Sequence, residues 1–249
     1  MAYQAFAQVY DRLMRDMPYD AWLRFTRAYW ERHGFRPVTV VELGCGTGNI
    51  AVPLARDGYR VIGIDVSDSM LAAAQAKTAR SGKADSARWI LQDMREWELG
   101  FPVDAVVSFC DSLNYLTEPE DVRAAFRQTF AGLRPGGLFL FDVHPPATLK
   151  RYADEQPFAL QEDDIAYLWT CGWDEERMEI EHHLTVFVQG ADGRYDRIDE
   201  WQVQRAYPLE RLVEWLKEAG FTDVECFADF AFAAPDGRSV RWFIGARRP

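Results

Sequence analysis

Residues 38–49 read VTVVELGCGTGN, and this stretch decides the fold. It begins with Val38, Thr39, Val40 and Val41, a β-branched run typical of a strand buried in a parallel sheet. It ends with glycines at three alternate positions, Gly44, Gly46 and Gly48. A strand that runs through such a turn into a helix can bring its backbone and the helix N-terminus close to a bound nucleotide.

The spacing of the glycines distinguishes this turn from a dinucleotide-binding one. A dinucleotide fingerprint needs G-x-G-x-x-G, but Asn49 stands at its third position and glycine falls at Gly48 instead. Glu42 stands two residues before the first glycine, so that the whole reads E-x-G-x-G-x-G.

Acidic residues follow the next predicted strands. Arg60 to Asp65 reads RVIGID, and Asp65 lies about twenty residues past the turn, where a βαβ nucleotide unit places its ribose-binding carboxylate. The alternative for Asp65 is a helix N-cap, although Ser67 suits that role better. A third strand, Arg88 to Leu91, precedes Asp93, which could equally be a turn residue.

A second recognisable block lies about ninety residues after the first. The fourth strand, 103–109, leads to Cys110 at the expected ligand edge of the sheet. Later the sequence LRPGGLFLFDV combines a tight turn with a fifth strand from Leu138 to Val143. The helix-to-strand block EWLKEAGF follows near the C-terminus.

Together these blocks resemble the class I S-adenosylmethionine-dependent methyltransferases. The resemblance implies a Rossmann-like α/β fold, with a seven-stranded sheet whose last strand is antiparallel, and S-adenosylmethionine as cofactor. It also implies that Asp93 holds the adenine amino group. The cofactor-binding residues it predicts are Tyr10, Glu42, Gly44, Cys45, Gly46, Gly48, Asp65, Val66, Asp93, Met94 and Cys110.

The N-terminal residues predict a short amphipathic helix. Tyr3, Phe6, Tyr10, Leu13 and Met17 fall at helical spacing, which by itself indicates packing on the sheet. The pair Tyr10-Asp11 is similar to a Tyr-Asp pair that closes over the cofactor in many members of the family.

We expect one domain over residues 1–249, with an antiparallel β-sheet inserted over about residues 146–207. The two-residue periodicity of the insert and its Gly190, Asp192 and Gly193 turn predict three or four strands. Its large aromatics and its acids suggest a wall of an acceptor pocket for a cationic or amine substrate. The aromatics could equally form the insert's own core or a subunit interface, with the acids as solvated surface.

His144 follows the fifth strand directly and is the candidate catalytic residue. It would touch the substrate or act as a base; otherwise it anchors the Pro145-Pro146 turn. Because the sulfonium methyl is already activated, a base is needed only if the acceptor must lose a proton. His182 shares the apolar face of its strand, where a hydrogen-bonded core histidine is the more common outcome.

Composition limits the function classes. The net charge is −11, which disfavours a non-specific nucleic-acid partner. The acidity first of all indicates solubility, and alternatively a small-molecule substrate that could be cationic. No apolar run is long enough to span a membrane. The four cysteines form no C-x-x-C pair, which suggests no metal site and free thiols in the cytoplasm. The insert permits a homodimer. The alternatives are a non-catalytic S-adenosylmethionine-binding protein or a nicotinamide-dependent oxidoreductase.

Overall fold

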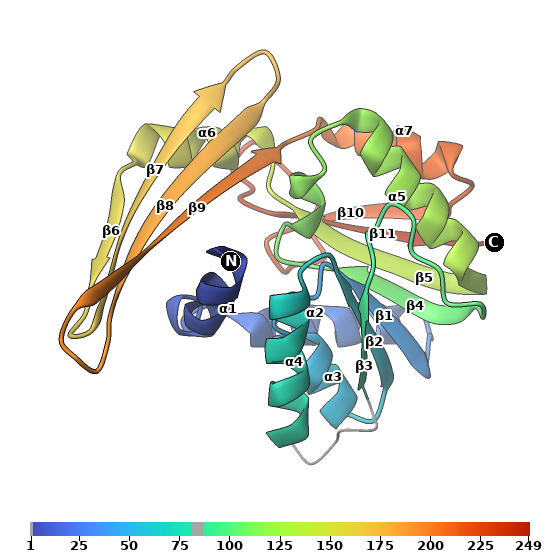
Figure 1. Ribbon diagram of the computed structural model, residues 1–249. Helices are drawn as coiled ribbons and strands as arrows, with labels where there is room; N and C mark the ends of the chain where they lie inside the picture. The colour runs from blue at the N-terminus through green and yellow to red at the C-terminus, as the bar shows by residue number, and fades with distance from the viewer. Residues whose placement is uncertain (1, 81–86) are drawn as a thin grey trace.

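Seven strands form one mixed sheet within residues 2–80 and 87–249, the part of the chain that the computed structural model describes (Figure 1). Their order is β10-β11-β5-β4-β1-β2-β3. β11 runs antiparallel to both of its neighbours, and the other described pairings of this sheet are parallel. The expected sheet with an antiparallel last strand is confirmed. The strands are β1 (Thr39–Leu43), β2 (Arg60–Asp65), β3 (Ala87–Leu91), β4 (Val103–Ser108), β5 (Leu133–Val143), β10 (Thr222–Ala228) and β11 (Trp242–Arg247).

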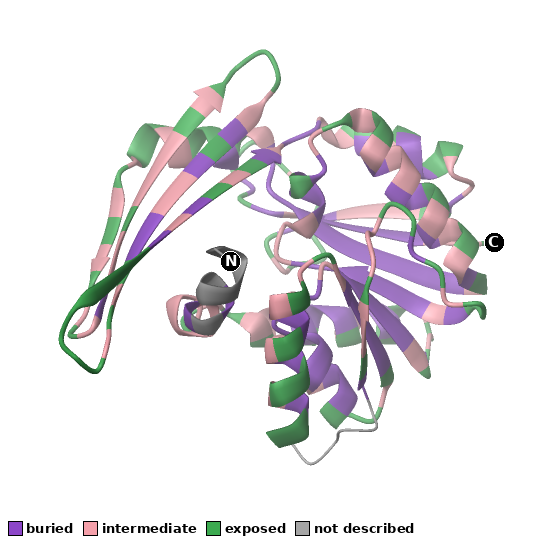
Figure 2. Ribbon diagram, viewed as in Figure 1, coloured by how far each residue is buried: buried purple, intermediate pink, exposed green. Residues whose placement is uncertain are grey.

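Helices cover both faces of this sheet because alternate strand residues point to opposite sides. Val41 and Val106 pack with α5 (Pro119–Gly132) and α7 (Leu209–Glu218). Val40 and Val107 pack with α2 (Tyr19–Arg32) and α3 (Ala51–Arg56). The central strands β1 and β4 are therefore buried at all but one position each, and Figure 2 shows them as mostly buried. α4 (Asp68–Arg80) follows β2 and packs beside β2 and β3.

The inserted segment forms a second, four-stranded antiparallel sheet among the described residues. Its strands are β6 (Phe158–Gln161), β7 (Ile165–Asp174), β8 (Glu179–Gln189) and β9 (Tyr195–Arg205). Gly190 and Gly193 join β8 to β9 through a hairpin turn, as expected from the sequence.

The expected two-residue periodicity from about Pro146 is wrong for the first ten residues, which form the helix α6 (Pro146–Glu155). Pro146 stands in the first turn of α6, where proline is tolerated. Leu149, Tyr152 and Ala153 share one side of the helix at spacings of three and four, and they pack against Ile180 of the insert. The helical spacing of these residues was visible in the sequence, but the clearer two-residue alternation of the residues that follow was extended over them.

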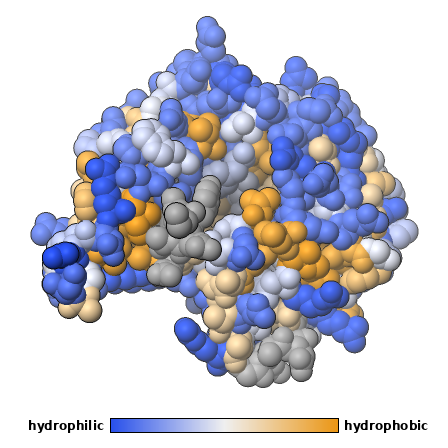
Figure 3. Space-filling model, in the orientation of Figure 1, coloured by the Kyte–Doolittle hydropathy of each residue, from blue (hydrophilic) through white to orange (hydrophobic). Residues whose placement is uncertain are grey.

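The N-terminal helix α1 (Ala2–Leu13) lies between the core and the insert (Figure 1). Ala7 and Val9 are buried in one cluster with Met70 of α4 and with Ile165 and Val186 of the insert. The side chains of Tyr3 and Phe6, which the sequence placed on the same helical face, lie outside the described residues. Figure 3 shows apolar side chains gathered on the insert and, across a hollow, on the core. α1 therefore joins the two sheets.

Candidate active site

The glycine turn lies at the carboxyl end of β1, and its three glycines meet different surroundings. All three have positive φ. A Cβ on Gly44 would lie 2.7 Å from Ser112, and one on Gly48 would lie 2.7 Å from Trp89. A Cβ on Gly46 would meet no heavy atom of the described residues within 4 Å, apart from its own chain neighbours. Gly44 and Gly48 thus permit close packing, whereas the backbone at Gly46 faces open space.

Asp65 closes the turn from the end of β2. Its carboxylate accepts hydrogen bonds from the backbone N–H of Gly46 at 2.8 Å and of Ser67 at 2.9 Å. Burial raises the pKa of Asp65, and these amide hydrogen bonds oppose that rise. Val66, the next residue, is exposed. The structure therefore brings Asp65 to the glycine turn, as the sequence spacing predicts.

Glu42 and Cys45 lie beneath the turn. Both are buried, and burial raises the pKa of each side chain well above its ordinary value. One carboxyl oxygen of Glu42 has no hydrogen-bond partner among the described residues. An unsatisfied buried carboxyl under an open, glycine-lined surface fits a site for a polar ligand.

Asp93 and Met94 follow β3 at the same edge of the sheet. Met94 packs close to Gly44. The Asp93 carboxylate is held by Arg95, whose Nη2 lies 2.6 Å and whose Nε lies 2.9 Å from its oxygens. Hydrogen bonds from Arg95 lower the pKa of Asp93. An adenine amino group would share this carboxylate with Arg95, a neighbour that sequence spacing did not reveal.

α1 is fastened to the glycine turn by Asp11. The Asp11 carboxylate accepts hydrogen bonds from Thr47 Oγ1 at 2.6 Å and Asn49 Nδ2 at 3.1 Å, and it pairs with Lys77 Nζ at 2.8 Å. Tyr10, its neighbour, is part of the cluster between α1 and the insert. The two residues of the Tyr-Asp pair thus contact different parts of the molecule.

The loop after β4 carries two consecutive non-glycine residues in the left-handed region. Cys110 has φ 55° and Asp111 has φ 54°. Such strain often marks functional sites. Burial raises the pKa of the Cys110 thiol. Ser112 contacts Gly44, so this loop, which continues into η2 (Ser112–Tyr115), abuts the glycine turn.

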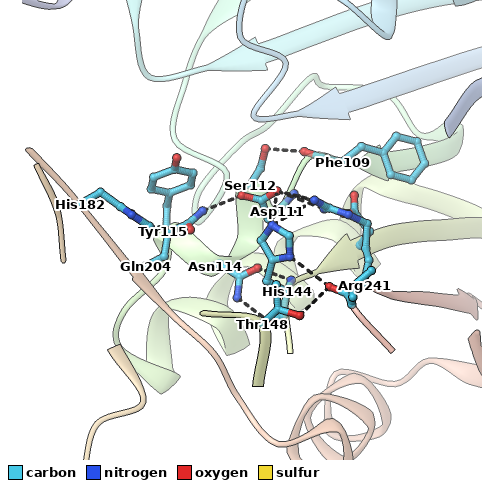
Figure 4. A network of polar contacts seen from close by, with 12 residues as sticks. Phe109, Asp111, Ser112, Asn114, Tyr115, His144, Thr148, His182, Gln204 and Arg241 are labelled. Carbon is cyan, nitrogen blue, oxygen red and sulfur yellow. Dashed lines mark hydrogen bonds and ion pairs between the residues drawn. The ribbon is translucent and has the colours of Figure 1, made fainter. Parts of the chain in front are cut away.

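The half-buried Asp111 of this loop forms a polar cluster with three buried residues, Asp142, His144 and Arg241. Figure 4 shows Asp111, His144 and Arg241 side by side. Arg241 bonds Asp142 through Nη1 and reaches Asp111 Oδ1 with both Nη1 and Nη2, at 3.1 Å each. Burial alone would raise the pKa of Asp111, but His144 and Arg241 outweigh it and hold that pKa low. We call these four residues the polar quartet.

A chain of hydrogen bonds links the quartet to the insert. Gln204 Nε2 donates to Asp111 Oδ2 at 2.7 Å, and Gln204 Oε1 lies 3.2 Å from His182 Nε2. Trp169 Nε1 then donates to His182 Nδ1 at 3.1 Å. His182 is thus a hydrogen-bonded interior histidine, in agreement with the sequence interpretation.

His144 is 8% exposed, and both of its ring nitrogens have protein partners. Nδ1 lies 3.3 Å from the carbonyl oxygen of Val240, which can only accept, so Nδ1 carries the proton. Nε2 lies 3.1 Å from Arg241 Nη2 and 3.3 Å from Asp111 Oδ1. Asn114 holds the backbone of His144 in both directions, at 2.9 and 3.2 Å. This geometry favours an anchoring role for His144.

The aromatics and acids of the insert are mostly engaged within it or with α1. Glu162 and Asp164 pair with Arg12 of α1. Trp173 donates to Glu175. Trp201 stacks on His183 on the exposed side of the sheet, with ring centroids 3.8 Å apart. These contacts suit the insert's own packing better than a pocket lining, so an acceptor site has to draw on other residues.

Among the described residues no grouping of side chains suits a metal ion, and no helix is long and apolar enough to span a membrane. Of the residues in the polar quartet and its link, the sequence singled out His144, His182 and, among the aromatics of the insert, Trp169. Asp111, Gln204 and Arg241 come from distant segments, and only the position of Asp111 after the fourth strand hinted at a role.

The fold and the site together define a doubly wound α/β protein with a glycine turn of the kind that binds nucleotides. Comparison with known proteins identifies the family within this class. A family model described as a methyltransferase domain matches residues 40–137. A Geobacillus sp. (strain WCH70) protein, whose name as a methyltransferase is provisional, is 40% identical over 249 residues. The alignment covers 100% of this chain and 100% of that protein. The chain therefore belongs to the class I, S-adenosylmethionine-dependent methyltransferases.

Solved structures support the fold. An S-adenosylmethionine-dependent methyltransferase from Clostridium acetobutylicum ATCC 824 superposes with a TM-score of 0.87 at 24% identity, over 99% of both chains. A sugar N-methyltransferase from Streptoalloteichus sp ATCC 53650 has a TM-score of 0.76 at 22% identity, over 97% of this chain and 93% of that one. The insert is thus part of a shared architecture.

Proposed function

We propose that this methyltransferase acts on a small-molecule acceptor and that the methyl group goes to an amine nitrogen. The observation that carries the proposal is the state of His144, whose two ring nitrogens both face protein partners. A hydroxyl acceptor needs a base to remove its proton, whereas a neutral amine attacks with its lone pair. His144 then anchors the loop instead of moving a proton.

The cofactor site of the proposal is built on the carboxyl edge of the sheet. Asp65 would accept the ribose hydroxyls with the lone pairs its amide partners leave free, and Asp93 with Met94 would border the adenine. Glu42, Cys45, Val66 and Cys110 would line the remainder, and Tyr10 would cover it. When bound, S-adenosylmethionine supplies an electrophilic methyl group on a positively charged sulfur. The residues of the chain align the acceptor and keep water away.

An anionic acceptor fits this site poorly. A carboxylate acceptor needs no base, but it would approach the negatively charged Asp111, which is half-buried in the loop after β4. Like charges at short distance in a poorly solvated site repel strongly. The neighbour from Streptoalloteichus is named a sugar N-methyltransferase, which agrees with an amine acceptor.

The insert would form one side of the acceptor pocket, with His144 beneath it. α6 leaves the core directly after β5, and Tyr152 of α6 packs edge-on to His144 with ring centroids 5.5 Å apart. The insert would therefore close the site through α6 and β9, while its outer side is left for solvent or for a second copy. The four cysteines are free, which supports a cytoplasmic location.

A labelled-methyl transfer experiment tests the proposal. The enzyme receives S-adenosylmethionine with a ¹³C-methyl group and two sets of acceptors. Within each set the skeleton is shared and the functional group is an amine, a hydroxyl or a carboxylate. The first set is D-glucosamine, D-glucose and D-glucuronate, and the second is ethanolamine, ethylene glycol and glycolate. We expect label only on nitrogen, identified by its carbon chemical shift. Label on oxygen would contradict the amine proposal. Tight cofactor binding without transfer to any acceptor of a wider panel would favour the non-catalytic alternative.

A further inference from the structure

Asp111 lies where an acceptor would meet the cofactor site. It follows β4 directly, and the next residue, Ser112, touches the glycine turn at Gly44. Its left-handed backbone turns it away from the strand. Tyr10 of α1 lies near enough to Asp111 and Tyr115 to interact with both electrostatically. Aromatic rings around a carboxylate are a common setting for a cationic group.

Hydrogen-bond donors face both carboxylates of the polar quartet. The Asp142 carboxylate faces only donors among the described residues: Trp22 Nε1, Arg241 Nη1 and the Asp111 backbone N–H. Asp111 likewise accepts from Arg241 and Gln204. His144 and Arg241 hold the pKa of Asp111 low, whereas burial raises the pKa of Asp142. A poorly solvated carboxylate such as Asp111 is stabilised by each further donor that reaches it.

The two oxygens of Asp111 are not equally occupied. Oδ1 faces Nη1 and Nη2 of Arg241 and Nε2 of His144. Oδ2 accepts one hydrogen bond, from Gln204, among the described residues. A carboxylate oxygen can accept two. Oδ2 therefore has room for one more donor.

The insert fixes the position of that oxygen. Because Asp111 can only accept, the amide of Gln204 must direct its N–H₂ toward Asp111 and its oxygen toward His182. His182 Nε2 then carries the proton, and Nδ1 accepts from Trp169. Each group in this series of hydrogen bonds is either a donor or an acceptor without conflict, so the insert holds Asp111 Oδ2 in a single position.

We propose that Asp111 recognises the acceptor nitrogen, and that Gln204 and His182 of the insert are the residues that position its carboxylate. The inference rests on the proposed transfer to an amine. The nitrogen lone pair forms the new N–C bond while the C–S bond breaks, its electron pair stays on sulfur, and the methylated ammonium releases a proton to water. Positive charge develops on the nitrogen as this happens, and the carboxylate stabilises it.

Inhibitor binding tests the assignment without a known acceptor. Sinefungin carries a cationic amine where S-adenosylmethionine carries the sulfonium methyl, and S-adenosylhomocysteine has an uncharged sulfur there. We expect calorimetry to show sinefungin binding about tenfold more tightly than S-adenosylhomocysteine. Asp111→Asn removes that preference while the Kd of S-adenosylhomocysteine changes less than about threefold. An unchanged preference in Asp111→Asn would overturn the proposal.

Asp142→Asn is the matched control, because it removes the other charge paired with Arg241 on the side of Trp22. We expect it to lower the melting temperature but to keep the preference for sinefungin. If it abolishes the preference equally, the charge of the quartet matters and Asp111 does not contact the ligand. If the parent binds neither inhibitor, the cofactor assignment itself fails, which is a separate result.

Gln204→Met gives a second test that leaves the Asp111–Arg241 ion pair intact, in case Asp111→Asn does not fold. It removes one hydrogen bond to Oδ2, so we expect the sinefungin preference to fall about threefold, and Gln204→Glu not to restore it. The control is Gln128→Met on helix α5, which removes a single hydrogen bond from Gln128 to the Trp97 carbonyl. Equal effects of Gln204→Met and Gln128→Met would rule out the positioning role.

Discussion

Gly46 and Gly48 lie two residues apart in one turn, but glycine is required at the two positions for different physical reasons. Gly48 is packed against Trp89, so any side chain there displaces the core. Gly46 has φ 52° and open space where a Cβ would stand. A substitution at Gly46 therefore tests the ligand surface with little change in packing.

We predict that Gly46→Ala weakens S-adenosylhomocysteine binding at least tenfold while it costs about 1–2 kcal/mol of folding free energy, the usual penalty for a left-handed alanine. Gly34→Ala is the control, because Gly34 has φ 58°, equally open surroundings and a position at the end of α2. Calorimetry and thermal melting of both variants check this. Equal binding by the two would show that the turn does not contact the cofactor.

Asp65→Ala should weaken cofactor binding about 10- to 100-fold, since charge-assisted hydrogen bonds contribute about 1.5–3 kcal/mol. Asp65 also bonds Gly46 and Ser67, so some stability will be lost. Affinity is therefore measured per folded molecule, with the folded fraction taken from denaturant titration. Unfolding with unchanged affinity per folded molecule would make Asp65 a structural residue.

At the scale of elements, α1 connects the glycine turn of the core to the inserted sheet, and we call this connection the strap. Its Asp11 holds the glycine turn and its Arg12 holds Glu162 and Asp164 of the insert. Because these adjacent residues hold the C-terminal end of α1 to both the turn and the insert, the helix should lower the rate at which a bound cofactor leaves.

We expect Asp11→Ala to weaken cofactor binding about tenfold, because two hydrogen bonds to the turn and one ion pair with Lys77 of α4 are lost. Asp16→Ala removes a neighbouring acid that is nearly fully exposed, and it should leave binding unchanged. Stopped-flow release of a fluorescent cofactor analogue separates the two. Identical release rates in Asp11→Ala and the parent would refute the strap.

The insert should also respond to acid through His182. Burial lowers the pKa of His182 below its ordinary 6.5, so that below pH 6.5 the unfolded chain holds a proton that the folded chain lacks. Stability from this residue is therefore complete above pH 6.5 and declines as pH falls toward the lowered pKa. We predict that the drop in melting temperature from pH 7.5 to 5.5 shrinks in His182→Gln. In His183→Gln, on the opposite side of β8, it should persist.

At the scale of the whole molecule, residue spacing along the sequence predicted those features that depend on a single short segment. The glycine turn, Asp65 and the alternation of β7 to β9 follow from spacing along one segment, and the sheet confirms that segment order. The polar quartet could not be predicted, because Asp111 and Arg241 are 130 residues apart and meet only when β11 pairs with β5. α6 was missed because the alternation after it dominated the interpretation.

The core binds the cofactor and the insert, through α1 and Gln204, completes the acceptor side. A crystal structure of the enzyme with sinefungin tests this account most directly. We predict that the ribose hydroxyls lie on Asp65 and that the amine of sinefungin lies within hydrogen-bond distance of Asp111 Oδ2, with α6 and β9 enclosing the approach. An amine that points to bulk solvent, with the insert more than a substrate length away and Asp111 bonded only to Arg241 and Gln204, would contradict the account.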